Sequence, residues 1–316
     1  MKSQSIDLLS IGGGLGRGFS IKMLDVLLKG RNSLSAEAQE RITEYIRSQM
    51  VDDAFFVGKN RQRDVYYTAF GLMLCYVFGV QVNCVEARAQ LEAYKPDERN
   101  LIHYAAYMRS VLILKLLDGK KAGIILSRLF SSEAKTLPPF TEYPHGDEYS
   151  PYSVFMMLSL KEEVGIKVED KKAVLERLDL YRVENGGYSN VAGEMSATAN
   201  ATAAALSVKW QLESNKGRSV SHEVGEDLEL LCRMQDDSGG FYATCLSPVP
   251  DILSTATALF VLSCYKKHPI VESEAFIEAH WLDSGGFAPT LLENESDIEY
   301  TFYGILALGA ALKHDK

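Results

Sequence analysis

The chain lacks three features that would place it outside the cell or across a membrane. Its five cysteines are odd in number and form no Cys-x-x-Cys pair, which predicts buried free thiols rather than disulfides or a metal cluster. No apolar run is long enough to span a bilayer. The polar N-terminal stretch Ser3–Ser5 is a poor match to a secretory signal. We therefore expect a cytoplasmic protein without a membrane span.

Basic charge is also scarce. Lysine and arginine number 33 against 42 aspartates and glutamates, for a net charge of -9. Binding to a phosphate backbone requires an excess of positive charge, so we expect no nucleic-acid partner. The remaining composition, 47% hydrophobic and 24% charged, is ordinary for a soluble globular protein and allows a large core.

Internal repetition is the dominant feature of the sequence. The clearest unit joins a Gly-Gly-aromatic turn to an Asp-x-x-x-Thr segment, as Gly285–Phe287 precedes Asp297–Thr301. The first residues of the six copies, some of them degenerate, are Asp64, Asn100, Asp147, Thr198, Asp251 and Asp297. These positions lie 36 to 53 residues apart, which is enough for two helices with their loops. The pattern predicts six helical hairpins.

Apolar segments alternate with amphipathic segments along these repeats. Ala69–Val80 and Tyr300–Leu312 are apolar nearly all round, so both faces of such a helix must be covered. Val85–Tyr94 is amphipathic and needs only one covered face. A closed ring of inner and outer helices buries all of these faces, whereas an open array would need polar capping repeats. The sequence therefore predicts an all-α fold, an (α/α)6 toroid of six helical hairpins.

The first part of the chain lies outside the repeats. We predict an N-terminal segment over residues 1–34 that leads into a single toroid domain over residues 35–316. The glycine-rich stretch Gly12–Gly18 lacks the spacing of a dinucleotide-binding turn, so we expect a flexible segment and no cofactor. Further along, Lys120–Phe130 predicts an outer helix and Ser132–Asp147 a proline-containing loop.

The repeat elements resemble those of protein prenyltransferase β subunits and of squalene and terpene cyclases. The resemblance covers about Ala54 to Leu312. It implies a toroid in which each Asp-x-x-x-Thr segment opens an inner helix at one mouth of the barrel. It also implies an isoprenoid-handling protein that binds a prenyl chain or prenyl diphosphate in the central cavity. The tyrosines expected to wall that cavity are Tyr66, Tyr67, Tyr107, Tyr152, Tyr300 and Tyr303.

Two questions of function stay open at this point. The resemblance allows an enzyme of the prenyltransferase or terpene cyclase type, and a functional prenyltransferase would also imply a helical partner protein. The alternative is a catalytically silent toroid that acts as a protein-interaction or ligand-binding module, because one fold hosts many functions. Whether the small-molecule partner is an isoprenoid or another apolar compound depends on the cavity.

The family's zinc site does not carry over. Prenyltransferases resemble one another in a zinc-binding Asp, a Cys two residues later and a His in the next repeat; the matching positions here hold Asp251, Leu253 and Tyr300. Leucine cannot bind a metal, so we predict no zinc site of this type and keep Asp251 and Tyr300 as ligand-binding candidates. The nearest other approach, Asp64 with His103, has a tyrosine where the thiolate belongs.

An acidic pair in the last repeat provides the catalytic candidates. Protonating cyclases resemble one another in an Asp-x-Asp-Asp-Thr motif in the same frame, where Glu299 takes the place of the acid and Asp297 that of the first aspartate. A neighbouring carboxylate would raise the pKa of Glu299 and keep it protonated, as protonation of an alkene requires. The plainer interpretation is that two acids at a helix start complement the helix dipole.

A basic loop in the first repeat provides the remaining candidates. It resembles the Gly-Arg-x-Asn-Lys loop whose cations, with a tyrosine, hold the diphosphate in prenyltransferases. Adjacent repeats place equivalent positions side by side, so Tyr67 and His103 are expected to be neighbours. The plainer interpretation is a solvated basic loop. The ligand-binding residues predicted at this mouth are Lys59, Arg61, Arg63, Asp64, Tyr67 and His103.

Overall fold

The computed structural model describes residues 18–52, 55–94, 100–118, 149–163, 166, 168, 170–213 and 221–312. The helix expected at Lys120–Phe130, the loop at Ser132–Asp147 and most of the glycine-rich stretch lie outside the described residues. The repeat anchor Asp147 lies outside them as well.

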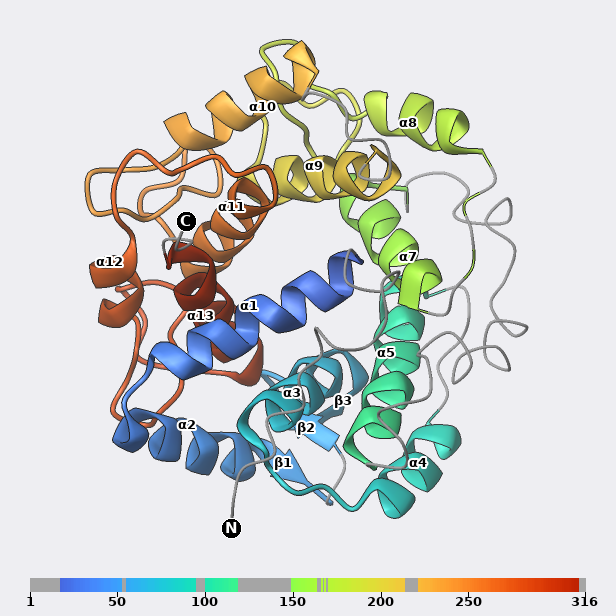
Figure 1. Cartoon of the computed structure of the whole chain (residues 1–316), viewed down its shortest axis with the longest axis vertical. Helices are drawn as coiled ribbons and strands as arrows, with labels where there is room; N and C mark the ends of the chain where they lie inside the picture. Colours follow the sequence, from blue (N-terminus) through green and yellow to red (C-terminus); the bar gives the residue numbers. More distant parts are fainter. Residues whose placement is uncertain are drawn as a thin grey trace.

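Six inner helices form a closed ring. They are α3 (Val65–Phe78), α5 (Leu101–Leu117), α7 (Pro151–Glu163), α9 (Ala199–Glu213), α11 (Ile252–Cys264) and α13 (Ile298–Ala311). Each inner helix packs on the next, and α13 packs on α3 to close the circle (Figure 1). The predicted all-α toroid is therefore confirmed.

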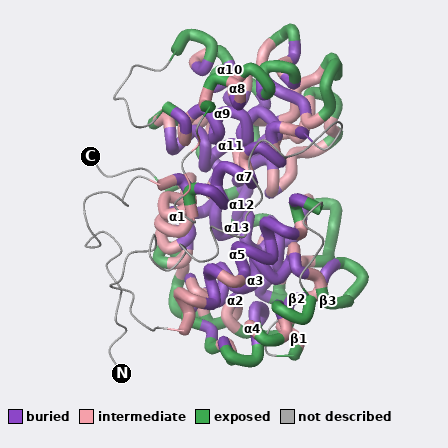
Figure 2. The backbone as a smooth tube through the Cα atoms, turned by 90° about the vertical axis from the view of Figure 1, so that its right-hand side faces the viewer, coloured by how far each residue is buried: buried purple, intermediate pink, exposed green. Residues whose placement is uncertain are grey.

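A second layer of helices surrounds this ring. The outer helices within the described residues are α2 (Ala36–Gln49), α4 (Cys84–Ala93), α8 (Lys171–Asp179), α10 (His222–Arg233) and α12 (Glu274–Ala279). Figure 2 shows buried positions concentrated along the inner helices and exposed positions on the outer layer. This distribution is what the alternation of apolar and amphipathic segments requires.

The Asp-x-x-x-Thr segment has a structural role in the repeats. The Asp251 carboxylate caps α11 by accepting the backbone N–H of Ser254 at 2.7 Å. The Thr255 hydroxyl donates to the backbone oxygen of Asp251 and accepts the buried N–H of Phe241 in the preceding turn at 2.9 Å. The last repeat has the same arrangement, with Asp297 capping α13. The motif thus ties each Gly-Gly-aromatic turn to an inner helix.

Helix α1 (Phe19–Ser33) covers one mouth of the ring and was not predicted. It crosses the ring in Figure 1 and lies at one side of the molecule in Figure 2. It packs closely on α13, because a Cβ atom on Gly309 would lie 1.9 Å from the backbone oxygen of Val26. A Cβ atom on Gly30 would lie 2.2 Å from the backbone oxygen of Ile305. Part of the segment assigned to residues 1–34 is therefore an ordered helix of the fold.

Short strands occupy the opposite mouth. The antiparallel sheet consists of β1 (Met50–Val51), β2 (Phe55–Val57) and β3 (Arg63–Asp64). The five cysteines are free thiols; four are buried, but Cys245 is exposed, which corrects the expectation of buried thiols at that position. None of the described helices combines the length and hydropathy of a membrane span.

Candidate functional site

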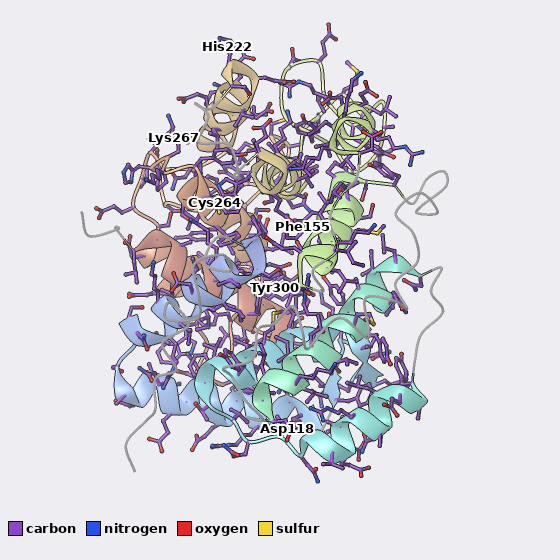
Figure 3. All side chains as sticks on the ribbon, turned by 45° about the vertical axis from the view of Figure 1, so that its right-hand side comes forward. Asp118, Phe155, His222, Cys264, Lys267 and Tyr300 are labelled. Carbon is purple, nitrogen blue, oxygen red and sulfur yellow. The ribbon has the colours of Figure 1, made fainter. Side chains whose placement is uncertain are left out.

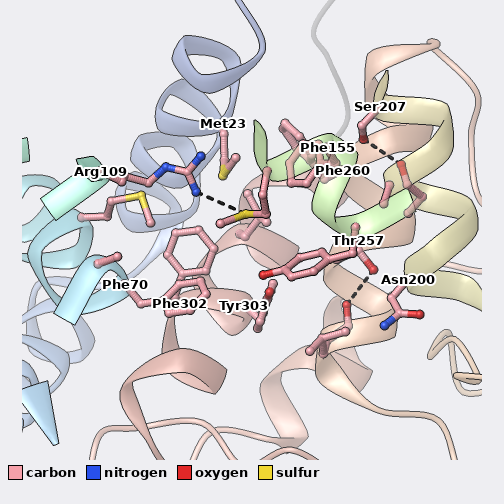
Figure 4. A pocket seen from close by; sticks show the side chains of 18 of the residues that line it. Met23, Phe70, Arg109, Phe155, Asn200, Ser207, Thr257, Phe260, Phe302 and Tyr303 are labelled. Atoms are coloured by element: carbon pink, nitrogen blue, oxygen red, sulfur yellow. Dashed lines mark hydrogen bonds between the residues drawn. The ribbon is translucent and has the colours of Figure 1, made fainter. Parts of the chain in front are cut away.

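A cavity of about 240 Å³ lies at the centre of the ring. All six inner helices and α1 contribute to its wall (Figure 4). The wall is mostly apolar and aromatic: its rings are Phe19, Tyr66, Phe70, Tyr152, Phe155, Phe260, Phe302 and Tyr303. The volume is slightly below the range of about 300–1,000 Å³ that is usual for small-molecule sites. The cavity is therefore suited to a compact apolar ligand.

Sequence reasoning located three of these aromatic residues. Tyr66, Tyr152 and Tyr303 line the central cavity as predicted, whereas Tyr300 lines a second cavity at the mouth. Figure 3 labels Tyr300, on the inner helix α13, and Phe155, on the inner helix α7. The phenylalanines were missed because apolar helices contain many aromatic residues, and only the closed ring shows which of them point inward.

The predicted acid, Glu299, lies directly behind the cavity wall. It is 8% exposed, and its Oε1 accepts a hydrogen bond from the hydroxyl of Tyr66 at 2.8 Å. Burial raises the pKa of Glu299 to about 7; the Tyr66 hydrogen bond opposes this rise, and the Asp297 carboxylate adds to it. The structure thus holds a carboxyl group that is half protonated near neutral pH and bonded to a phenol of the cavity wall.

Asp297 differs from Glu299 in its surroundings. Its carboxylate caps α13 by accepting the N–H of Tyr300 at 2.8 Å, and burial raises its pKa. It lines the mouth cavity rather than the central one. Both acids lie at the start of α13, as the helix-dipole interpretation requires; Asp297 also caps the helix, whereas Glu299 also bonds to Tyr66.

A buried arginine is the second polar group of the central cavity. Arg109, on the inner helix α5, is 9% exposed and lines the cavity. Its Nε donates to Oε1 of Glu163 at 3.1 Å. Its Nη1 faces the thioether sulfur of Met156 at 3.7 Å, as Figure 4 shows. Sequence reasoning missed this residue, although a cation in the middle of a mostly apolar helix, away from the basic last turn at Lys115, was a signal that could have found it.

The mouth cavity is larger, about 650 Å³, and mixed in charge. Lys59 and Arg61 contribute cations, and the Lys59 ammonium lies 5.2 Å from the ring centroid of Tyr300. The carboxylates in its wall belong to Glu293, Glu295 and Asp297. The structure therefore brings together Lys59, Arg61, Tyr300 and Asp297 among the predicted residues.

Other predicted residues lie elsewhere. Arg63 forms an ion pair with Asp52 and stacks over Phe55, so it does not line the mouth cavity with Lys59. Asp64 caps α3 by accepting the N–H of Tyr66 at 2.8 Å.

The expected proximity of Tyr67 and His103 stays a prediction: their helices, α3 and α5, pack against each other, but no hydrogen bond or ring contact joins these two described side chains. Tyr67 is buried, and its ring meets that of Tyr66 at 5.8 Å. The backbone N–H of His103 bonds to the side chain of Asn100 at the start of α5, and His103 lines neither cavity.

The positions that match the family's zinc ligands have different surroundings. Asp251 caps α11, Leu253 lines the central cavity, and Tyr300 lines the mouth cavity. Within the described residues, no three His, Cys, Asp or Glu side chains are grouped as metal ligands would be.

The ring of inner helices around a central aromatic cavity defines an α/α toroid. The family model for the prenyltransferase alpha-alpha toroid domain matches residues 17–110 and 141–315, so the chain belongs to this family. A solved structure of similar fold is Candida albicans protein geranylgeranyltransferase-I complexed with GGPP. The two share 15% identity with a TM-score of 0.52, over 91% of this chain and 90% of that chain. A search of curated proteins found no match.

Proposed function

We propose that this protein binds an isoprenoid-type apolar chain in the central cavity. The observation that carries the proposal is the cavity itself, an aromatic-walled space at the centre of a toroid of the prenyltransferase family. Aromatic walls suit such chains because they offer a large apolar contact area. The similarity in fold to a protein complexed with GGPP supports the same class of ligand. The small volume favours a chain of the length of farnesol over a long polyprene.

The charges at the mouth favour a neutral ligand over a prenyl diphosphate. Lys59 and Arg61 face three carboxylates in the same cavity, and Arg63 is already paired with Asp52. A diphosphate placed there would be repelled by those carboxylates as well as attracted by the two cations. We therefore propose that Lys59, Arg61, Asp297 and Tyr300 form the entrance.

Acid catalysis is the second candidate function, and the Glu299–Tyr66 pair favours it. A carboxyl group with a pKa of about 7 can hold a proton near neutral pH and release it to a reacting group. The Tyr66 hydroxyl joins Glu299 to the cavity wall, and the aromatic faces around it could stabilise a developing carbocation. If Glu299 is the acid, Glu299→Gln should abolish conversion of a prenyl chain of farnesol length while leaving its binding intact. Absence of any product with the unmodified protein would remove this candidate.

A cavity-filling variant tests the binding proposal. Ala204 lies in the cavity wall, so Ala204→Phe would occupy part of the space. Isothermal titration with farnesol should give one site in the wild type and at least a tenfold weaker affinity in Ala204→Phe. Ala89→Phe, at an exposed position of α4, is the matched control and should bind as the wild type does. Equal affinity in both variants, or no binding by the wild type, would refute the proposal.

A further inference from the structure

We infer that the central cavity binds its chain by a neutral oxygen atom, such as a hydroxyl, ether or carbonyl oxygen, through a hydrogen bond from the guanidinium of Arg109. This inference rests on the proposed chain-binding function and names the chemical class of the ligand. It concerns a different residue from the Glu299–Tyr66 pair and a different cavity from the mouth.

The first observation is a donor without a strong acceptor. Guanidinium carries five N–H donors and no acceptor. Glu163 pairs with one edge of Arg109: its Oε1 accepts a hydrogen bond from Nε at 3.1 Å and lies 3.1 Å from Nη2. Nη2 is buried and forms no hydrogen bond within the described residues. On the other side, the acceptor that Nη1 finds among the described residues is the sulfur of Met156 at 3.7 Å, and a thioether is a weak acceptor.

The second observation is the place where this donor lies. Arg109 is 9% exposed, and the wall around it consists mainly of aromatic and aliphatic side chains (Figure 4). A buried polar group without a good partner is costly, and a hydrogen bond formed in such surroundings is stronger than one formed in water. A ligand that places an oxygen beside Nη1 would supply the missing acceptor, whereas a pure hydrocarbon would leave the donor unsatisfied.

The neighbouring carboxylate argues for a neutral oxygen rather than an anionic group. Arg109 is already neutralised by Glu163, whose Oε1 also accepts the hydroxyl of Ser20 at 2.7 Å. A carboxylate or phosphate that reached Arg109 would also lie close to the Glu163 carboxylate, so like-charge repulsion would reduce its affinity.

The test compares probes that differ in one oxygen atom. Farnesene, farnesyl methyl ether and farnesyl diphosphate are titrated against the wild-type protein by calorimetry. A hydrogen bond to a charged donor predicts that the ether binds about tenfold or more tightly than the hydrocarbon. In Arg109→Met that preference should vanish while affinity for farnesene is kept.

Two further variants keep the test decisive. Arg109→Met leaves Glu163 unpaired and could unfold the protein, so Arg109→Met/Glu163→Gln removes both charges together. Lys172→Met removes an exposed cation from the outer helix α8, outside both cavities, and should leave the preference for the ether unchanged.

Each outcome bears on the inference. Equal affinity of the wild type for ether and hydrocarbon, or a preference that survives in the double variant, would overturn the role of Arg109 and leave chain binding standing. Tightest binding of the diphosphate, lost on changing Arg109, would overturn the neutral class of ligand. If no probe binds the wild type, the proposed function itself fails, and this inference fails with it.

Discussion

Replacing Glu299 by glutamine should make the protein more stable at alkaline pH. The pKa of Glu299 rises from 4.5 to about 7 in the folded protein, mainly because the carboxyl group is buried. At about 1.4 kcal/mol for each tenfold change in proton affinity, the ionised form is disfavoured by up to about 3 kcal/mol. Because the folded-state pKa is the higher one, protonation stabilises the fold fully below pH 4.5, and this contribution is lost as the pH rises to about 7.

Glutamine is neutral at every pH and can still accept the Tyr66 hydrogen bond, so Glu299→Gln avoids the penalty. Urea denaturation followed by circular dichroism should give wild type and variant similar stability at pH 4.5. At pH 8.5 the variant should be more stable by up to about 3 kcal/mol. The control Glu295→Gln, at an exposed position in the same loop region, should show no such difference. A Glu299→Gln protein that is equally or less stable than the wild type at pH 8.5 would refute the reasoning.

Three further predictions address the repeat motif, α1 and the mouth. Thr255→Val removes the acceptor of a buried backbone N–H and should lower the free energy of unfolding by about 1–3 kcal/mol in urea; an unchanged midpoint would contradict the role given to the motif. Gly309→Ala places a Cβ atom 1.9 Å from a backbone oxygen of α1 and should speed protease cleavage in that helix. Gly225→Ala, whose Cβ meets open space, is its control, and equal cleavage of both would count against close packing of α1. The double variant Lys59→Ala/Arg61→Ala should bind farnesol as the wild type does. If the wild type binds farnesyl diphosphate in a salt-sensitive way and the double variant does not, the diphosphate head group binds at the mouth, which would contradict the proposal of a neutral ligand.

The fold was predictable because the distribution of apolar residues around each helix indicates whether one face or all faces of that helix are buried. A segment such as Ala69–Val80 is apolar nearly all round, and the structure places most of it in the buried inner helix α3. The Asp-x-x-x-Thr frame marked helix starts because aspartate and threonine satisfy backbone groups there. Helix α1 escaped prediction because it belongs to no repeat and packs through small residues, Gly30 against α13 and Gly309 against α1.

The site was only partly predictable, for a different physical reason. Frame position identified Glu299 and Tyr66 separately, but their hydrogen bond depends on the last repeat meeting the first when the ring closes. The partnership of Arg109 with Glu163 likewise joins two neighbouring inner helices and follows no fixed spacing in the sequence. Arg63 was grouped with Lys59 by adjacency alone, whereas the short strands turn it toward Asp52.

The most direct measurement is a crystal structure of the protein grown with farnesyl methyl ether. The account predicts the chain in the central cavity, in contact with Phe155, Phe260 and Tyr303, with its oxygen within hydrogen-bonding distance of Arg109. A chain bound at the mouth beside Tyr300, or a central cavity that stays empty at saturating ligand, would contradict it.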